Sequence, residues 1–198
     1  MQDKSKIHRI YENYYFQIHQ IFDEIRNVLG DNNEGILKVI TLKKNDYLLR
    51  EGDYCKNFSY LKSGILRIYY TNEGNEIITS FAFSNDVTTI LRSISLNEPS
   101  RESIQAITDC EVVSISIEEY QNLKLHYPLI EKLDAQIIQC YALILEERLF
   151  SLKFQTATER YQMLLEHEPQ IVKYVPLTFI ASYLGITLET LSRIRSHK

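Results

Sequence analysis

The spacing of the apolar residues changes twice along this chain, and this change limits the folds that the chain can adopt. From Lys4 to Leu29 apolar residues recur at three- and four-residue steps, which predicts an amphipathic helix that ends at Gly30-Asp31-Asn32-Asn33. Short runs rich in β-branched and aromatic residues then alternate with Gly, Asn and Asp. The predicted strands are residues 36–42, 47–50, 59–62, 65–70, 76–83, 104–107 and 112–117. Strands at this spacing are typical of an all-β sandwich or barrel.

Helical spacing returns after the last predicted strand. A short helix is expected over Glu118–Leu125, and His126-Tyr127-Pro128 ends it. A long helix follows from Leu129 to Phe154, with no Gly or Pro inside. Three more helices are predicted over residues 156–166, 176–184 and 187–196. We therefore expect an α+β fold with a jelly-roll-like β-roll and flanking helices over residues 1–128, a long helix over 129–154 and a helical domain over 155–198.

Two rows of apolar residues run along the predicted long helix. The second row contains Ile138, Tyr141, Leu145, Leu149 and Leu152. Two rows indicate two packing partners, and we expect these to be the β domain of the same chain and a second copy of the chain. The alternative is a helix buried on two sides within one protomer. The residues predicted to form the dimer helix are those of the first row, Ile130, Leu133, Ile137, Cys140 and Ile144.

Composition and charge exclude several classes of protein. No apolar stretch approaches the ~20 residues that cross a bilayer, and the N-terminus does not resemble a signal peptide, so a cytoplasmic protein is expected. Cys55, Cys110 and Cys140 are far apart, and the five histidines have no metal-binding spacing, so neither a disulfide framework nor a metal site is predicted. The net charge is −4, but residues 150–198 carry 6 basic against 4 acidic residues. A mildly basic C-terminal segment is compatible with a polyanionic partner.

Residues 177–195 are the most informative segment for function. Ile180, Ala181 and Leu184 form the inner face of a first helix, and Gly185 suits a tight turn into a second helix. Thr187 can cap that second helix, and Arg193 on it can donate two hydrogen bonds to guanine. The candidate DNA-contacting residues are Thr187, Glu189, Thr190, Ser192, Arg193 and Arg195. The alternative is a C-terminal helical hairpin that binds no nucleic acid.

The order of elements resembles the Crp/Fnr superfamily of transcription regulators over nearly the whole chain. The segments that carry the resemblance are residues 49–53, 61–68 and 184–193. The chain is similar in particular to the short members typical of Bacteroidetes. The resemblance implies a cyclic-nucleotide-binding-like sensor domain, a helix-turn-helix, a homodimer and an inverted-repeat DNA operator. It also implies an unidentified small-molecule effector and, if the protein is an activator, RNA polymerase as a partner, with no membrane contact.

The sequence departs from the cyclic-AMP-binding members at the phosphate-binding segment. In those members a Gly-Glu pair and an Arg-Ser pair hold the nucleotide, and the corresponding positions here are Thr89-Ile90 and Ser100-Arg101. Isoleucine cannot accept a hydrogen bond from a ribose hydroxyl, so cyclic AMP is not the expected ligand. Arg92 and Arg101 are the candidate residues of an effector pocket for another anion, and the alternative is that both are solvated surface arginines.

No cofactor is predicted. The cysteine cluster that holds an iron–sulfur centre in oxygen-sensing relatives is absent, and no histidine has a context that favours haem. Only Ser196-His197-Lys198 follow the second helix of the hairpin, so the wing of longer relatives is missing and weaker DNA binding per monomer is expected. The competing hypothesis is a ligand-sensing or protein-binding module with a vestigial hairpin. An enzyme is not expected, because no catalytic motif is present.

Overall fold

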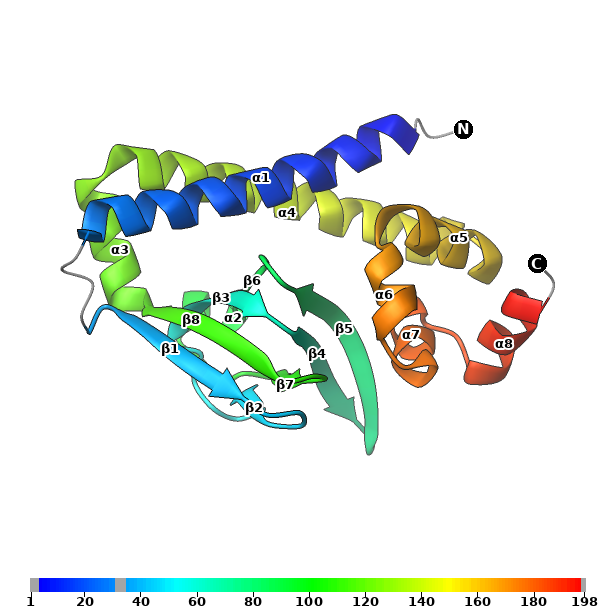
Figure 1. Ribbon diagram of the computed structural model, residues 1–198. Coiled ribbons are helices and arrows are strands. Elements are labelled where there is room, and N and C mark those ends of the chain that lie inside the picture. The colour runs from blue at the N-terminus through cyan, green and yellow to red at the C-terminus, as the bar shows by residue number, and fades with distance from the viewer. Residues whose placement is uncertain (1–3, 31–34, 197–198) are drawn as a thin grey trace.

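The computed structural model describes residues 4–30 and 35–196, and it confirms the predicted α+β architecture (Figure 1). Part of the turn expected after the first helix, residues 31–33, and the final His197-Lys198 lie outside the described residues. The helices are α1 (Lys4–Leu29), α2 (Leu91–Leu96), α3 (Ile117–His126), α4 (Pro128–Phe154), α5 (Ala157–His167), α6 (Pro169–Tyr174), α7 (Leu177–Leu184) and α8 (Leu188–Ser196). The strands are β1 (Leu37–Leu42), β2 (Tyr47–Leu49), β3 (Asn57–Ser63), β4 (Ile65–Asn72), β5 (Asn75–Phe83), β6 (Val87–Thr88), β7 (Ser103–Ala106) and β8 (Cys110–Ser116).

The strands form a sandwich of two four-stranded antiparallel sheets. One sheet has the order β1-β8-β3-β6 and the other has the order β2-β7-β4-β5. Apolar side chains from both sheets fill the space between them, among them the fully buried Leu61, Leu66 and Val112. The turn into β4 needs Gly64, which has a φ of +103° and would place a Cβ 2.5 Å from the Asp109 carbonyl oxygen. A side chain at this position would push β4 away from β8.

Helices α1 and α4 lie side by side across one face of the sandwich (Figure 1). Their contact forms a second core, in which Ile18 and Ile25 of α1 pack with Ile130 and Leu133 of α4 and with Ile115 of β8. Pro128 occupies the first turn of α4, where its missing N–H breaks no hydrogen bond, so it starts the helix. The β-roll is thus covered by a pair of helices from opposite ends of the sensor segment.

The four C-terminal helices form a third core together with the outer face of the second sheet. Ile171, Ile180 and Leu191 are fully buried there, and they share the cluster with Ile78 and Phe81 of β5. Helix α5 begins with a capping box, in which the Thr156 hydroxyl accepts from the Glu159 amide while the Glu159 carboxylate accepts from the Thr156 amide. The C-terminal helices are therefore packed onto the β-roll.

Three elements were not predicted from the sequence. Strand β6 has two residues, and helices α2 and α6 have six residues each. Residues 167–175 lie between two predicted helices, but Pro169 is the first residue of α6. Proline is favoured at a helix start, so the same residue ends α5 and begins the next helix.

Candidate nucleic-acid interface and effector cavity

Helices α7 and α8 form a helical hairpin with a tight, capped turn. Gly185 has a φ of 66° and a ψ of 39°, the left-handed conformation that ends α7. The Gly185 and Ile186 amides donate to the carbonyls of Ser182 and Ala181, each at 3.0 Å. The Thr190 amide donates to the Thr187 hydroxyl at 3.2 Å, so Thr187 caps the start of α8 as the sequence predicts.

The polar residues of α8 face solvent. Leu191 is fully buried and Ile194 is half-buried against α7, which fixes the inner side of the helix. Thr187, Glu189, Ser192, Arg193 and Arg195 are exposed, and Thr190 is half-buried. The pKa of Glu189 is lowered by a hydrogen bond from its own amide, by the Thr187 hydroxyl and by the charge of Arg193. Five of the six candidate DNA-contacting residues are thus accessible to a partner, on α8 or directly before it.

Helix α7 is held against β5 by hydrogen bonds as well as by apolar contact. The Ser182 hydroxyl accepts from the Ile78 amide at 3.0 Å and donates to the Glu76 carbonyl at 3.2 Å. Arg148 of α4 donates to the carbonyl oxygens of Thr79 and Tyr183, and its guanidinium lies 4.0 Å from the centre of the Tyr183 ring. Helix α7 is therefore tied to both the β-roll and α4.

The two arginines predicted for an effector pocket do not come together in one site. Arg92 lies on α2, where it pairs with Glu98 at 3.1 Å and lines the edge of a cavity. Arg101 is exposed and is not among the residues that line that cavity. Ile90, at the predicted position of the ribose-binding glutamate, is buried in the core of the sandwich. The buried Ser100 hydroxyl donates to the Glu102 carbonyl at 2.6 Å.

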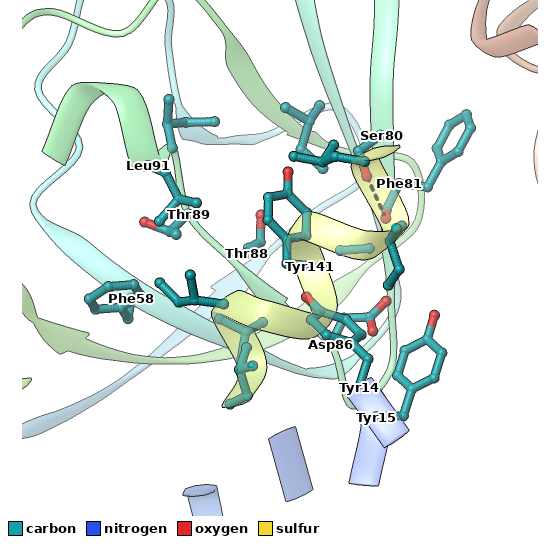
Figure 2. Close-up of a pocket in the computed structure, with 18 of the residues that line it drawn as sticks. Tyr14, Tyr15, Phe58, Ser80, Phe81, Asp86, Thr88, Thr89, Leu91 and Tyr141 are labelled. Carbon is teal, nitrogen blue, oxygen red and sulfur yellow. Dashed lines mark hydrogen bonds between the residues drawn. The ribbon is translucent and has the colours of Figure 1, made fainter. Parts of the chain in front are cut away.

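A cavity of about 520 Å³ lies between the helix pair and the β-roll, and it extends to the C-terminal helices (Figure 2). Its walls combine apolar side chains with tyrosine rings from four helices and with acidic groups from the roll. The polar residues that line it include Tyr11, Tyr14, Tyr15, Thr79, Ser80, Asp86, Thr88, Thr89, Glu102, Tyr141, Arg148, Glu168 and Tyr183. A second space of about 450 Å³ lies at the β2–β3 end of the roll, and the two share Thr88 and Thr89.

Asp86 is the buried acidic group in the wall of the larger cavity. Only 6% of the residue is exposed, and its Oδ2 accepts from the Phe83 amide at 2.7 Å. Among the described residues no donor reaches its Oδ1. Burial raises the pKa of Asp86 to about 7, although the hydrogen bond from Phe83 acts in the opposite direction. Figure 2 shows the Asp86 carboxyl among Tyr14, Tyr15 and Tyr141.

A buried acid–tyrosine pair lies at the other end of the cavity. The Tyr183 hydroxyl donates to Glu168 at 3.2 Å. Burial raises the pKa of both groups, and the nearby positive charge of Arg148 opposes the shift in each. The cavity therefore reaches from the β-roll to the contact that holds α7 in place.

The structure places the predicted dimer row of α4 largely inside the protomer. Ile130, Leu133 and Cys140 are buried, while Ile137 and Ile144 are half-buried and line the cavity. Their main neighbour is α1, which follows α4 along its length. Other apolar side chains of α4 are exposed instead: Ile138, Leu143, Leu145, Leu149, Phe150, Leu152 and Phe154.

The sequence did not indicate Asp86, the α1 tyrosines or Arg148 as site residues, and it placed Tyr141 only in an apolar row of the predicted long helix. Tyr11, Tyr14 and Tyr15 repeat at helical spacing, but this pattern is also typical of a helix face that packs in a core. Within residues 4–30 and 35–196 no cluster of His, Cys, Asp or Glu could hold a metal ion. None of the described helices is long and apolar enough to cross a bilayer.

Comparisons with known proteins agree with this architecture. The family model of the cyclic nucleotide-binding domain matches residues 39–127, from β1 to the start of α4. No curated protein matches the chain.

Solved structures match over most of the chain. FixK2 from Bradyrhizobium japonicum has a TM-score of 0.68 at 22% identity, covering 82% of this chain and 84% of its own. A cyclic nucleotide-binding domain containing protein from Listeria monocytogenes has a TM-score of 0.69 at 14% identity, covering 89% of both chains. The c-di-GMP responsive global regulator CLP from Xanthomonas campestris has a TM-score of 0.57 at 19% identity, covering 82% and 86%. Residues 39–127 thus match the cyclic nucleotide-binding domain family, and the chain shares its fold with FixK2 and the other solved structures.

Proposed function

We propose that this protein is a sequence-specific DNA-binding transcription regulator of the Crp/Fnr type, which acts in the cytoplasm as a homodimer and is not an enzyme. The observation that carries the proposal is the capped α7–α8 hairpin, whose second helix presents its polar side chains to solvent. A helix of this kind can enter the major groove with its N-terminal end toward the bases.

The residues of α8 suit distinct contacts with DNA. Arg193 can donate two hydrogen bonds to O6 and N7 of guanine, and Glu189 can accept from the amino group of cytosine. Thr187, Thr190, Ser192 and Arg195 suit the phosphates on either side. The packing of Leu191 in the core fixes the rotation of α8, so these side chains keep one orientation toward the groove.

Cyclic AMP does not suit this chain as an effector. Ile90 is buried in the core and offers no acceptor to a ribose, and a ribose hydroxyl left unpaired costs ~1–3 kcal/mol. The exposed Arg101 does not line the cavity, and Arg92 is already paired with Glu98. We expect that cyclic AMP leaves the DNA affinity of the protein unchanged.

The homodimer is proposed to form through the exposed apolar side of α4. Leu145, Leu149 and Leu152 recur at four- and three-residue steps and are each about half exposed. A second copy of the helix would cover them. The first apolar row of α4 would then support the contact from inside the protomer, because it fixes α4 against α1.

Selection of binding sites from a random duplex DNA pool tests the proposed function. The wild-type protein, Arg193→Ala and Arg26→Ala are compared at near-physiological salt. Arg26 is an exposed arginine on α1, so its loss removes the same charge far from α8. We expect the wild type and Arg26→Ala to enrich the same inverted repeat, with Arg193→Ala losing specificity at one base pair, a loss of ~1–3 kcal/mol. Indistinguishable enrichment by all three proteins would show that Arg193 reads no base.

A further inference from the structure

Among the described residues, one buried acceptor in the wall of the cavity between α1, α4 and the β-roll has no hydrogen-bond donor. Asp86 is buried, and among the described residues its Oδ1 has no hydrogen-bond partner. An unpaired buried carboxylate oxygen costs free energy, so it marks a place where a donor is missing. The oxygen belongs to a residue that lines an open volume of about 520 Å³, a size typical of small-molecule sites.

The other charged groups around the cavity already have partners. Glu102 accepts from the Thr79 hydroxyl at 2.5 Å, and Glu168 accepts from Tyr183. Asp134 accepts from the Tyr120 hydroxyl at 2.7 Å and pairs with Lys124. The cation Arg92 pairs with Glu98, and Arg148 donates to two backbone carbonyls. Asp86 is therefore the charged group of this wall that is left to bind a ligand.

The sign of the charge around the cavity favours a cation. Four carboxyl groups line it, from Asp86, Glu102, Asp134 and Glu168, against the two guanidinium groups of Arg92 and Arg148. The acidic excess would repel a phosphate or a carboxylate placed in the cavity. An ammonium group would instead be attracted and could donate a hydrogen bond to Asp86.

Tyrosine side chains lie near the same carboxyl group. The rings of Tyr14 and Tyr141 are stacked with their centres 6.4 Å apart, and the Tyr15 ring meets Tyr14 edge-on at 5.6 Å. The charge of Asp86 acts on Tyr14 and Tyr15, which lie beside it in Figure 2. The negative face of an aromatic ring attracts a cation, and several rings together form the usual site for an organic ammonium ion. The rings and Asp86 thus favour the same kind of ligand.

We propose that this cavity binds a small organic ammonium ion with an aromatic or apolar body, whose charged nitrogen lies against Asp86 and the tyrosine rings. The apolar body would lie along Ile137, Ile138 and Leu145 of α4, which also line the cavity. At the far end the ligand would approach Arg148 and Tyr183, which tie α7 to the rest of the molecule. The ligand site stands without DNA binding, but its effect on DNA binding rests on the function proposed above.

Three probes of one shape and different charge test the site by isothermal titration calorimetry on the full chain at pH 8. Tyramine carries an ammonium group, 4-ethylphenol lacks it, and 4-hydroxyphenylacetate carries a carboxylate instead. We expect one tyramine per chain, bound at least ~10-fold more tightly than 4-ethylphenol, because the ammonium gains a charge-assisted hydrogen bond. The carboxylate should bind most weakly. Absence of tyramine binding at millimolar concentration, or equal affinities for the three probes, would contradict the proposal.

Two aspartate variants show whether the charge of Asp86 is responsible. Asp86→Asn keeps an acceptor for the Phe83 amide and removes the negative charge. The substitution should lower the affinity for tyramine at least ~10-fold and leave the affinity for 4-ethylphenol unchanged. A melting curve confirms that the variant is folded. Asp23→Asn, at an exposed position of α1 outside the cavity, should change neither affinity. A wild-type tyramine affinity in Asp86→Asn would overturn the proposal.

The pH dependence gives a further readout of the same group. The titratable and charged groups that share the cavity with Asp86 are Tyr11, Tyr14, Tyr15, Arg92, Glu102, Tyr120, Asp134, Tyr141, Arg148, Glu168 and Tyr183. Burial raises the pKa of Asp86 to about 7, so tyramine should bind more tightly at pH 8 than at pH 6, and this difference should vanish in Asp86→Asn. A pH response retained by the variant would contradict the assignment. Since calorimetry uses no DNA, its failure contradicts the ammonium site alone, whereas failure to enrich a DNA site contradicts only the proposed function.

Discussion

At the scale of single residues, Asp86 shows how position in the fold changes the chemistry of a common side chain. In the sequence it belongs to a Ser-Asn-Asp turn, a context that usually leaves an aspartate solvated. In the structure its Oδ2 closes the turn through the Phe83 amide, and α1 covers the carboxyl group with tyrosines. Periodicity along α1 could predict that those tyrosines share a face, but not that they meet Asp86, because that contact depends on tertiary packing.

The raised pKa of Asp86 predicts how the stability of the protein depends on pH. Its folded-state pKa of about 7 exceeds its ordinary value of 3.8, so the folded protein holds this proton more tightly than the unfolded chain. Protonated Asp86 therefore makes its full contribution to folding stability below about pH 4. This contribution is lost as the pH rises toward 7, by at most ~1.4 kcal/mol per pH unit. Urea unfolding measures this effect. Between pH 5 and pH 8 the free energy of unfolding should fall by ~1–3 kcal/mol more in the wild type than in Asp86→Asn.

Asp23→Asn is the control for that measurement, because the substitution is the same and the position is exposed. Its free energy of unfolding should change between pH 5 and pH 8 by the same amount as that of the wild type. If Asp86→Asn and the wild type lose equal stability over this interval, Asp86 does not titrate in the cavity wall.

At the scale of elements, apolar periodicity predicts much of the fold. Helices α1 and α4 and the seven longer strands lie where the sequence predicts them, within a few residues, because each buries a regular face. Strand β6 and helices α2 and α6 were missed because two to six residues are too few to show a period. The Ser93 hydroxyl of α2 accepts a hydrogen bond from the Cys55 amide, a tertiary contact that no local pattern contains.

The sequence also predicts two apolar rows on α4 without showing which partner each one meets. Helix α1 covers the row of Ile130 and Leu133, since the two helices pack along their length. In the other row Tyr141 lines the cavity, whereas Ile138, Leu145, Leu149 and Leu152 are each about half exposed. The prediction that α4 forms a dimer contact therefore now rests on a different side of the helix.

A charge on the exposed row of α4 should disrupt the dimer. Leu149 is 55% exposed in the protomer, so Leu149→Glu should fold normally but place two carboxylates in an apolar contact. We expect light scattering during gel filtration to show a dimer for the wild type and a monomer for the variant at micromolar concentration. Leu125→Glu on α3, where the leucine is 82% exposed, is the matched control and should remain dimeric. A dimeric Leu149→Glu would exclude this side of α4 as the contact.

At the scale of the whole molecule, three cores join the parts into one body. The core between the sheets builds the roll, a second fixes α1 and α4 on it, and a third joins the C-terminal helices to β5. The large cavity touches residues of all three parts, from Asp86 in the roll to Tyr183 in α7. A ligand in it would be placed to alter the contact between α7 and β5, and with it the position of α8.

The central claim is that this molecule reads a DNA sequence as a dimer, and its affinity for two duplexes tests that claim most directly. One duplex carries the inverted repeat enriched from the random pool, and the other carries the same bases in scrambled order. Fluorescence anisotropy at near-physiological salt should show the enriched duplex bound at least ~10³-fold more tightly, with two chains per duplex. Equal affinities for the two duplexes, or the absence of any enriched sequence, would contradict the claim and favour a sensor module that does not read DNA.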